Sequence, residues 1–226
     1  MKKFNINKNK KLAMRKLLLS LALMSCFLFL QAQDGTISLQ TKGLAKQVCT
    51  NDSFNSFEAS FAFESIESNL VETEKGTFSA VTIANTFPSG ADGTPELPVA
   101  RKLIAVPHGA VPQVVVKSYD ETEYKLSDFG IKSIYPHQPS VRKDMKPEDV
   151  KFVYSEKAYT AKSYEDRPVA QVEVLGTLRD LRIGTLTINP VIYNPANNSI
   201  IVRNNIDVEV VFEGADYEAT KTAHEK

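Results

Sequence analysis

The chain has 226 residues, with 27 basic and 27 acidic side chains, 42% hydrophobic residues and two cysteines. This length suffices for one domain with a hydrophobic core, or at most for two small ones. The charge is unevenly distributed, because residues 1–32 contain seven Lys or Arg and no acidic residue. The remaining chain has 20 basic and 27 acidic residues, a net charge of −7, which gives it no electrostatic reason to bind nucleic acid or anionic lipid.

Residues 1–32 have the organisation of a secretory signal peptide. A basic start is followed by an apolar run at residues 17–30 and by the small residue Ala32. The run is shorter than the roughly 20 apolar residues that a membrane-spanning helix needs. Met14 is a second possible start, and cleavage at Cys26 as in a lipoprotein is disfavoured because apolar residues continue after it. We expect signal cleavage, no membrane insertion afterwards, and an exported protein in the periplasm, at the cell surface or secreted.

Catalytic and metal-binding patterns are weak throughout the chain. Cys49 alone remains after signal cleavage, which excludes an intramolecular disulfide. Its surroundings carry no cysteine-protease signature, and His108 and His137 lie next to prolines, which indicates turn or surface histidines rather than catalytic ones. The histidines and cysteines lack metal-ligand spacing, and there is no Gly-rich phosphate loop. We therefore predict a protein without catalytic residues, cofactor or metal.

The dominant hydrophobic period is two, as expected for half-buried strands. Alternation is clearest at residues 57–63 and 206–212, and shorter β-branched runs occur at 103–106, 114–116, 172–175 and 181–188. The turn sequence Asn-Pro-Ala-Asn-Asn-Ser at 194–199 separates two apolar runs, which predicts a hairpin followed immediately by a third strand. No sustained helical period follows the signal peptide. The pattern favours an all-β fold, an antiparallel β-sandwich or a jelly-roll-like barrel.

One segment departs from this pattern. Residues 133–151 contain three prolines and a charged cluster around Lys143, with almost no periodicity. Long loops in small domains are usually functional or disordered. We expect an exposed, functional loop here.

Several motifs, in order along the chain, resemble the N-terminal prodomains of the gingipains, which are secreted cysteine proteases specific for basic residues. They include Pro-Glu-Leu-Pro-Val-Ala-Arg-Lys-Leu-Ile-Ala-Val-Pro at 95–107, Pro-His-Gln-Pro-Ser at 136–140, Phe-Val-Tyr at 152–154, Leu-Thr-Ile-Asn-Pro at 186–190 and Val-Arg-Asn-Asn-Ile at 202–206. The resemblance covers residues 49–217 and implies a β-sandwich prodomain. Residues 33–48 are then expected to be a flexible N-terminal segment, and residues 218–226 a truncated C-terminal tail.

The resemblance also implies a mechanism. In this family a prodomain loop enters the active-site cleft of the protease and offers a basic residue to the specificity pocket. Lys143 matches that residue, and the lysine-specific branch of the family is similar in having Lys there. Arg142 would be presented instead if the register slipped by one residue, and Asp144 would place a carboxylate near the scissile bond.

The expected function is therefore that of an inhibitory and folding-assisting propeptide whose partner is the catalytic domain of a gingipain-like cysteine protease. Family members continue with that catalytic domain, so a truncated gene product and a free-standing inhibitor both remain open. The alternative is an exported β-sandwich binding module unrelated to protease control.

Overall fold

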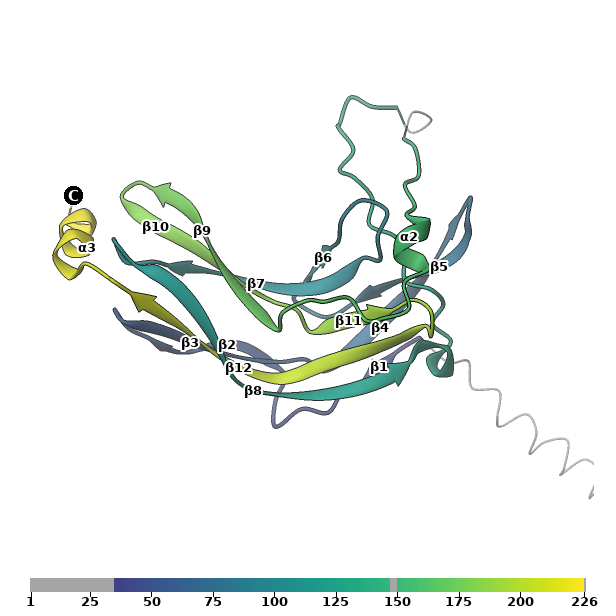
Figure 1. The fold of residues 1–226 in the computed structure, drawn as a ribbon, viewed down its shortest axis with the longest axis horizontal. Coiled ribbons are helices and arrows are strands. Elements are labelled where there is room, and N and C mark those ends of the chain that lie inside the picture. The colour runs from purple at the N-terminus through teal and green to yellow at the C-terminus, as the bar shows by residue number, and fades with distance from the viewer. Residues whose placement is uncertain (1–34, 147–149, 226) are drawn as a thin grey trace, which may run out of the picture. The chain divides into compact units, whose positions relative to one another are not determined.

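The computed structural model describes residues 35–146 and 150–225. In these residues the strands are β1 (Ile37–Ser38), β2 (Lys46–Asp52), β3 (Ser56–Ala62), β4 (Ser65–Thr73), β5 (Gly76–Thr82), β6 (Phe87–Ser89), β7 (Leu97–Ala105), β8 (Val111–Lys125), β9 (Ala170–Leu178), β10 (Leu181–Ile188), β11 (Val191–Asn194) and β12 (Ser199–Glu213); the helices are the 3-10 helix η1 (Leu126–Phe129), α2 (Glu156–Tyr159) and α3 (Tyr217–His224) (Figure 1). The predicted signal peptide, residues 1–32, lies outside the described residues.

The strands form three antiparallel sheets. One has the order β1-β4-β5, the second β6-β7-β10-β9, and the third β11-β12-β3-β2 with β8 also paired to β12. Every pair of named strands is antiparallel. The prediction of an all-β, antiparallel fold is confirmed.

The long strand β12 organises the third sheet. One of its edges pairs with β8 from Ser199 to Glu213, while the other edge pairs first with β11 and then with β3. The β11–β12 hairpin occurs as predicted, but the separate third strand does not, because β12 runs through the whole segment. The register with β8 shifts after Asn204, so a β-bulge marks the point where β12 changes neighbour from β11 to β3.

Asn204 fills this bulge with its side-chain amide. Its Oδ1 accepts a hydrogen bond from the Phe63 N–H at 2.8 Å, and its Nδ2 donates to the carbonyl oxygens of Phe63 and Gln40, each at 2.9 Å. The side chain is buried, with 5% of the residue exposed. It therefore supplies Phe63 with the donor and acceptor that a neighbouring strand would otherwise give.

The hydrophobic core lies between the sheets. Burial alternates along β12, where Ile206, Val208 and Val210 point inward, and β3 and β10 contribute residues to the same cluster. The largest fully buried side chains are Phe61, Ile37, Ile66, Leu97, Leu126, Ile131, Ile134, Leu186, Ile188, Ile200, Ile206 and Val99. The period of two in the sequence thus corresponds to the core-facing side of each strand.

Two segments differ from the sequence-based expectation. Within the expected flexible segment 33–48, Ile37 is completely buried and pairs with Ile66, and β2 begins at Lys46. The expected tail contains helix α3, which starts where the Asp216 carboxylate accepts a hydrogen bond from the Ala219 N–H. A helix of eight residues shows too few turns for its period to be recognised in the sequence. No helix among the described residues is long and apolar enough to cross a membrane.

Candidate functional site

Residues 139–146 and 150–152 belong to a loop that extends away from the sheets beside α2 (Figure 1). Its outermost described part is a turn in which the Met145 N–H donates to the Arg142 carbonyl oxygen at 3.1 Å. Lys143 and Asp144 occupy the two central positions of this turn. All residues from Ser140 to Lys146 are exposed, so the turn offers its side chains to solvent or to a partner.

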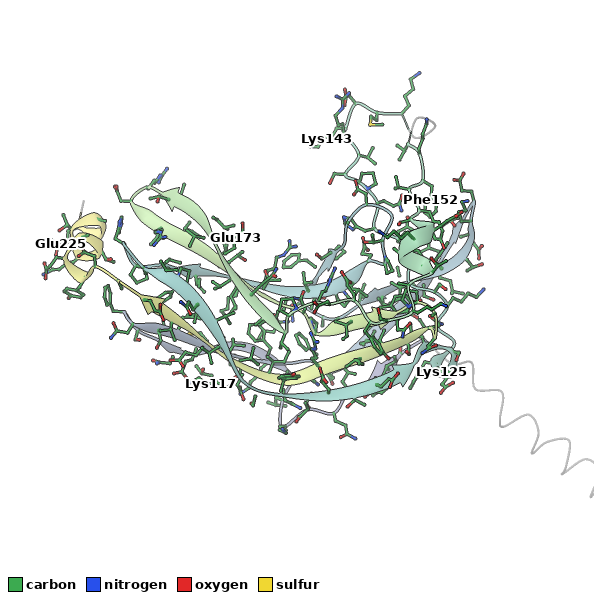
Figure 2. All side chains as sticks on the ribbon, viewed as in Figure 1. Lys117, Lys125, Lys143, Phe152, Glu173 and Glu225 are labelled. Carbon is green, nitrogen blue, oxygen red and sulfur yellow. The ribbon has the colours of Figure 1, made fainter. Side chains whose placement is uncertain are left out.

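The three predicted site residues adopt different roles in this turn. Arg142 Nη2 lies 3.1 Å from Asp144 Oδ2, so these two side chains form an ion pair with each other. Lys143 forms no ion pair with any residue that the structure describes, and it lies on the exposed part of the loop, away from the sheets (Figure 2). Val141 and Met145, two positions before and after Lys143, are 51% and 39% exposed. The turn therefore presents a free ammonium group flanked by apolar side chains.

The chain that leads into the loop is held firmly, which differs from the expectation that all of residues 133–151 are exposed. We call residues 133–138 the entry limb. Its Tyr135 N–H donates to the Ser79 carbonyl oxygen of β5 at 2.8 Å, and its His137 N–H donates to the Thr94 carbonyl oxygen at 2.8 Å. Ile134 is fully buried. The exposed part of the loop begins only at Ser140.

The chain that leaves the loop, residues 152–155, is tied to the entry limb, and we call it the exit limb. Gln138 makes two hydrogen bonds with the backbone of Val153: its Oε1 accepts from the N–H and its Nε2 donates to the carbonyl oxygen, both at 2.9 Å. The backbone of Gly93 joins the limbs a second time, because its N–H donates to the His137 carbonyl oxygen and its carbonyl oxygen accepts from the Ser155 N–H. The two ends of the loop are therefore fixed relative to each other.

An aromatic cluster supports both limbs from β5. Phe152, at the base of the loop in Figure 2, has its ring centroid 6.4 Å from that of Phe78 and 6.2 Å from that of Tyr135. Tyr154 stacks on Tyr159 of α2 at 4.6 Å. The Tyr159 hydroxyl donates to the Ile134 carbonyl oxygen at 2.6 Å, and burial raises the pKa of Tyr159 well above its ordinary value. Aromatic packing of this kind makes the base of the loop part of the domain.

His137 has a role that sequence reasoning missed. Its Nδ1 lies 2.7 Å from Glu96 Oε2, and both side chains are about a quarter exposed. The sequence indicated only a turn or surface histidine, since the partner lies 41 residues away along the chain. The pair is a further link between the entry limb and residues 93–96.

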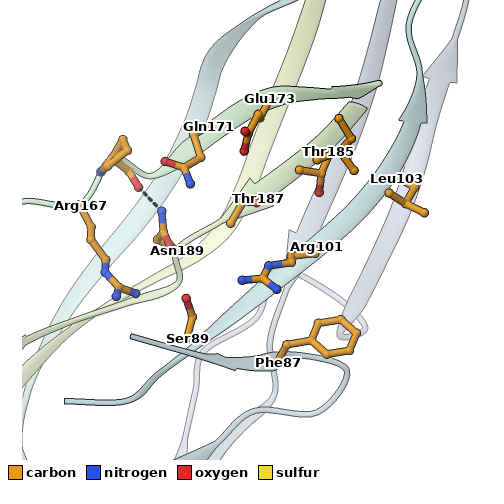
Figure 3. Close-up of a pocket in the computed structure, with 12 residues that line it drawn as sticks. Phe87, Ser89, Arg101, Leu103, Arg167, Gln171, Glu173, Thr185, Thr187 and Asn189 are labelled. Atoms are coloured by element: carbon orange, nitrogen blue, oxygen red, sulfur yellow. Dashed lines mark hydrogen bonds between the residues drawn. The ribbon is translucent and has the colours of Figure 1, made fainter. Parts of the chain in front are cut away.

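A separate groove of about 780 Å³ lies on the outer face of the sheet β6-β7-β10-β9. Figure 3 shows Arg101 and Glu173 reaching over it from β7 and β9, with Phe87 and Leu103 at its side. Phe87 and Leu103 are more than half exposed. The groove is a mixed polar and apolar surface suited to a ligand or a protein segment.

The described residues offer little other site chemistry. Cys49 is exposed, and its Sγ lies 3.4 Å from the Asn51 carbonyl oxygen rather than beside a histidine. Within residues 35–146 and 150–225, no group of three or more His, Cys, Asp or Glu is arranged to hold a metal ion. The exposed loop with Lys143 remains the candidate site.

Comparison with known proteins agrees with this architecture. The family model Propeptide_C25 matches residues 44–225. The chain belongs to the Propeptide_C25 family. The matched range begins before and ends after the predicted domain at residues 49–217, and it includes α3.

Curated relatives of this family member include Lys-gingipain of Porphyromonas gingivalis, which is 48% identical over 212 residues, or 94% of this chain. Lys-gingipain HG66 from the same species is 47% identical over the same length. The chain spans 12% of the length of these relatives. The match is therefore confined to a propeptide-sized portion of much longer proteins.

Two solved structures share the fold. A structure concerning the zymogenic latency of gingipain K from P. gingivalis is 49% identical, with a TM-score of 0.75, and the match covers 80% of this chain and 98% of that one. A complex of the pro- and mature domains of RgpB from the same species matches with a TM-score of 0.65 at 21% identity, covering 75% of this chain and 86% of that one. The second likeness is evidence for the fold alone. The family model, the Lys-gingipain relatives and the gingipain K structure confirm the family resemblance drawn from the sequence motifs.

Proposed function

We propose that this member of the Propeptide_C25 family is an inhibitory and folding-assisting propeptide of an exported gingipain-like cysteine protease. Its loop enters the active-site cleft of the catalytic domain, and Lys143 occupies the pocket that selects basic side chains. The observation that carries the proposal is the exposed Lys143, without a described ion pair, on a loop whose base is anchored by hydrogen bonds. The name of the relative concerned with zymogenic latency supports the same role.

The local ion pair favours Lys143 over Arg142 as the anchor. Presenting Arg142 to an acidic pocket would require its ion pair with Asp144 to break, whereas Lys143 has no described ion pair to lose. A basic side chain that becomes buried against an acidic partner can dominate an interface. Asp144 therefore serves two purposes in the proposal, since it holds Arg142 aside and lies directly after the residue in the pocket.

The flanking side chains fit the same arrangement. Val141 and Met145 are exposed apolar residues on either side of Lys143, and exposed apolar groups next to a recognition residue typically become buried on binding. They would pack against the walls of the cleft on either side of the Lys143 pocket. The propeptide itself then needs no catalytic residues, and it acts wherever the protease is exported, in the periplasm or at the cell surface.

The test is inhibition of purified Lys-gingipain by the full chain and by its Lys143→Ala variant. Loss of a central anchor of about 2 kcal/mol weakens inhibition by roughly 30-fold. Lys146→Ala is the matched control, because Lys146 is an equally exposed lysine three residues further along the same loop. It should inhibit within about twofold of the unchanged protein.

Other variants determine which residue enters the pocket. Arg142→Ala should inhibit nearly as well as the unchanged protein if Lys143 is the anchor. Equal inhibition by the unchanged chain and by Lys143→Ala would overturn the assignment of Lys143 but not the inhibitory function. Absence of inhibition by the unchanged chain, with its fold verified by circular dichroism, would overturn the inhibitory function.

The groove on the outer face of β6-β7-β10-β9 supports the alternative of a binding module unrelated to protease control. Its exposed Phe87 and Leu103 beside Arg101 resemble a ligand-binding surface. In that case the full chain leaves Lys-gingipain active, and the Arg101→Ala variant binds the ligand of the groove more weakly than the unchanged chain does. Inhibition that depends on Lys143 excludes this alternative as the principal function.

A further inference from the structure

We propose that the side-chain amide of Gln138, together with the backbone of Gly93, is a clamp that holds the loop in shape and makes it an inhibitor rather than a good substrate. Gln138 is thus a positioning residue that acts through Lys143. The inference rests on the proposed function and adds to it the device that keeps Lys143 in place.

The geometry of Gln138 is that of a peptide group. Its Oε1 accepts from the Val153 N–H and its Nε2 donates to the Val153 carbonyl oxygen, so both partners belong to a single residue on the opposite limb. The same Nε2 also lies 2.9 Å from the carbonyl oxygen of Pro136 on its own limb. Rotating the amide by half a turn would place N–H against N–H and oxygen against oxygen, so this orientation alone satisfies both groups.

The position of Gln138 gives the clamp its effect on the loop. The backbone of Gly93 bridges His137 on the entry limb and Ser155 on the exit limb. The bond from Gln138 to Val153 lies closer to the tip of the loop on both limbs. Among residues 139–146 and 150–152, which the structure describes, no hydrogen bond joins the two sides of the loop. Removing the Gln138 amide would lengthen the unrestrained span at both ends, while the ties through Gly93 would remain.

A loop closed at its base binds with less loss of conformational entropy than an open one. Each residue that binding must order carries an entropic cost. A loop whose tip is already ordered therefore binds the pocket through Lys143 with higher affinity. Freeing the residues next to the clamp should weaken inhibition by roughly five- to tenfold, about 1–1.4 kcal/mol.

The clamp also affects cleavage by the protease. Cleavage after Lys143 begins when the protease thiolate attacks the Lys143 carbonyl carbon; the bond to the Asp144 nitrogen breaks, and that nitrogen leaves as an amine after taking up a proton. Water then hydrolyses the thioester, giving a Lys143 carboxylate and the free thiol. Overall one water is consumed and one peptide bond is lost. Because Gln138 and Val153 lie on opposite sides of this bond, the clamp stays intact and slows departure of the two new ends from the cleft.

The experiment compares the full chain with Gln138→Met, which keeps the length and volume of the side chain but removes its hydrogen bonds. Gln113→Met is the matched control, because Gln113 is a glutamine on β8 whose Nε2 bonds the Glu213 carboxylate far from the loop. Each change is made in the unchanged chain and in Lys143→Ala. The measurements are the inhibition constant against purified Lys-gingipain and the thermal midpoint for every chain, and the rate of cleavage after Lys143, by mass spectrometry, for the chains that keep Lys143.

We expect Gln138→Met to weaken inhibition roughly five- to tenfold and to speed cleavage after Lys143, with Gln113→Met leaving both unchanged. In the Lys143→Ala background the change at Gln138 should have less than about a twofold effect, because it acts through Lys143. Inhibition and cleavage rate equal to those of the unchanged chain would overturn the clamp. An equal fold-loss in both backgrounds would also overturn it, because that result marks a general structural effect. If the single variant Lys143→Ala inhibits as well as the unchanged chain, the assignment of Lys143 as the anchor has failed. This comparison involves no Gln138 variant, so it distinguishes failure of the anchor from failure of the clamp.

Discussion

Replacing Asn204 by alanine tests how the long strand β12 changes neighbours. The Asn204 amide sits at the bulge and bonds both the N–H and the carbonyl oxygen of Phe63. Alanine removes these bonds and cannot fill the space of the amide. The Phe63 backbone then loses its partners while it stays inside the protein, where Phe63 is 2% exposed.

The expected cost follows from these contacts. A buried polar group that loses its partner costs about 1–3 kcal/mol. Two backbone groups of Phe63 are affected, and partial access of water through the bulge offsets part of the loss. We expect a decrease of about 3 kcal/mol in the free energy of unfolding, or roughly 6–12 °C in the thermal midpoint of a domain of this size.

Urea unfolding followed by circular dichroism measures this difference, and Asn69→Ala is the control. Asn69 is an exposed asparagine in β4, so its replacement should change the free energy of unfolding by about 0.5 kcal/mol or less. A result for Asn204→Ala within the same range, with an unchanged dependence on urea, would refute the role of the amide as a substitute for a strand. Asn204→Asp should also destabilise at neutral pH, and less so in acid, because a protonated carboxyl group can again donate to Phe63 or Gln40.

Two further changes test the base of the loop. Since burial raises the pKa of Tyr159 above its ordinary value of 10, its contribution to stability is complete below about pH 10 and is lost as the pH rises further, at ~1.4 kcal/mol per pH unit. Tyr159→Phe should lower the free energy of unfolding by about 1 kcal/mol at pH 7, because the hydrogen bond to Ile134 is lost. Above pH 10 the free energy of unfolding of this variant should fall less steeply than that of the unchanged protein. Urea unfolding of both proteins at pH 7 and at pH 10–11.5 measures the two effects. Gly93 has φ of +77°, and a Cβ there would lie 3.0 Å from the backbone nitrogen of Ser155. Gly93→Ala should therefore lower the free energy of unfolding by about 2 kcal/mol or more. Gly214→Ala, at φ of +70° with no heavy atom closer than 3.7 Å, should lose only the ~1 kcal/mol of backbone strain, and equal losses by thermal unfolding would contradict a close approach at Gly93.

The alternation of side chains was sufficient to predict most of the sheet. Residues 57–63 and 206–212 correspond to β3 and to the end of β12, and the run at 181–188 coincides with β10. Such runs are recognised locally because an antiparallel strand buries every second side chain against the core. The continuity of β12 was not recognised, because the polar pair Asn204-Asn205 interrupts the apolar residues and looks like the end of one strand and the start of another, although Asn204 itself is buried in line with Val202 and Ile206.

The candidate site, too, was predictable from the sequence only in part. The charged, proline-rich composition of residues 133–151 and the family motifs identified the loop and Lys143. The ion pair of Arg142 with Asp144 joins residues two apart, yet only the turn geometry shows that it leaves Lys143 free. The partners of the base, such as His137 with Glu96, lie far apart in the sequence, and no local pattern marks them.

The sequence by itself determined that this protein is all-β and a member of a propeptide family, because these properties depend on a period of two and on motifs. The composition of residues 1–32 also predicts export. Only the tertiary structure decided how the loop is held. A hydrogen bond from Gln138 to Val153 joins the two limbs, and the backbone of Gly93 bonds both of them. The base of the loop packs on aromatic rings from β5 and α2. Contacts of this kind arise when segments distant in the chain pack together, so their energy exists only in the assembled fold.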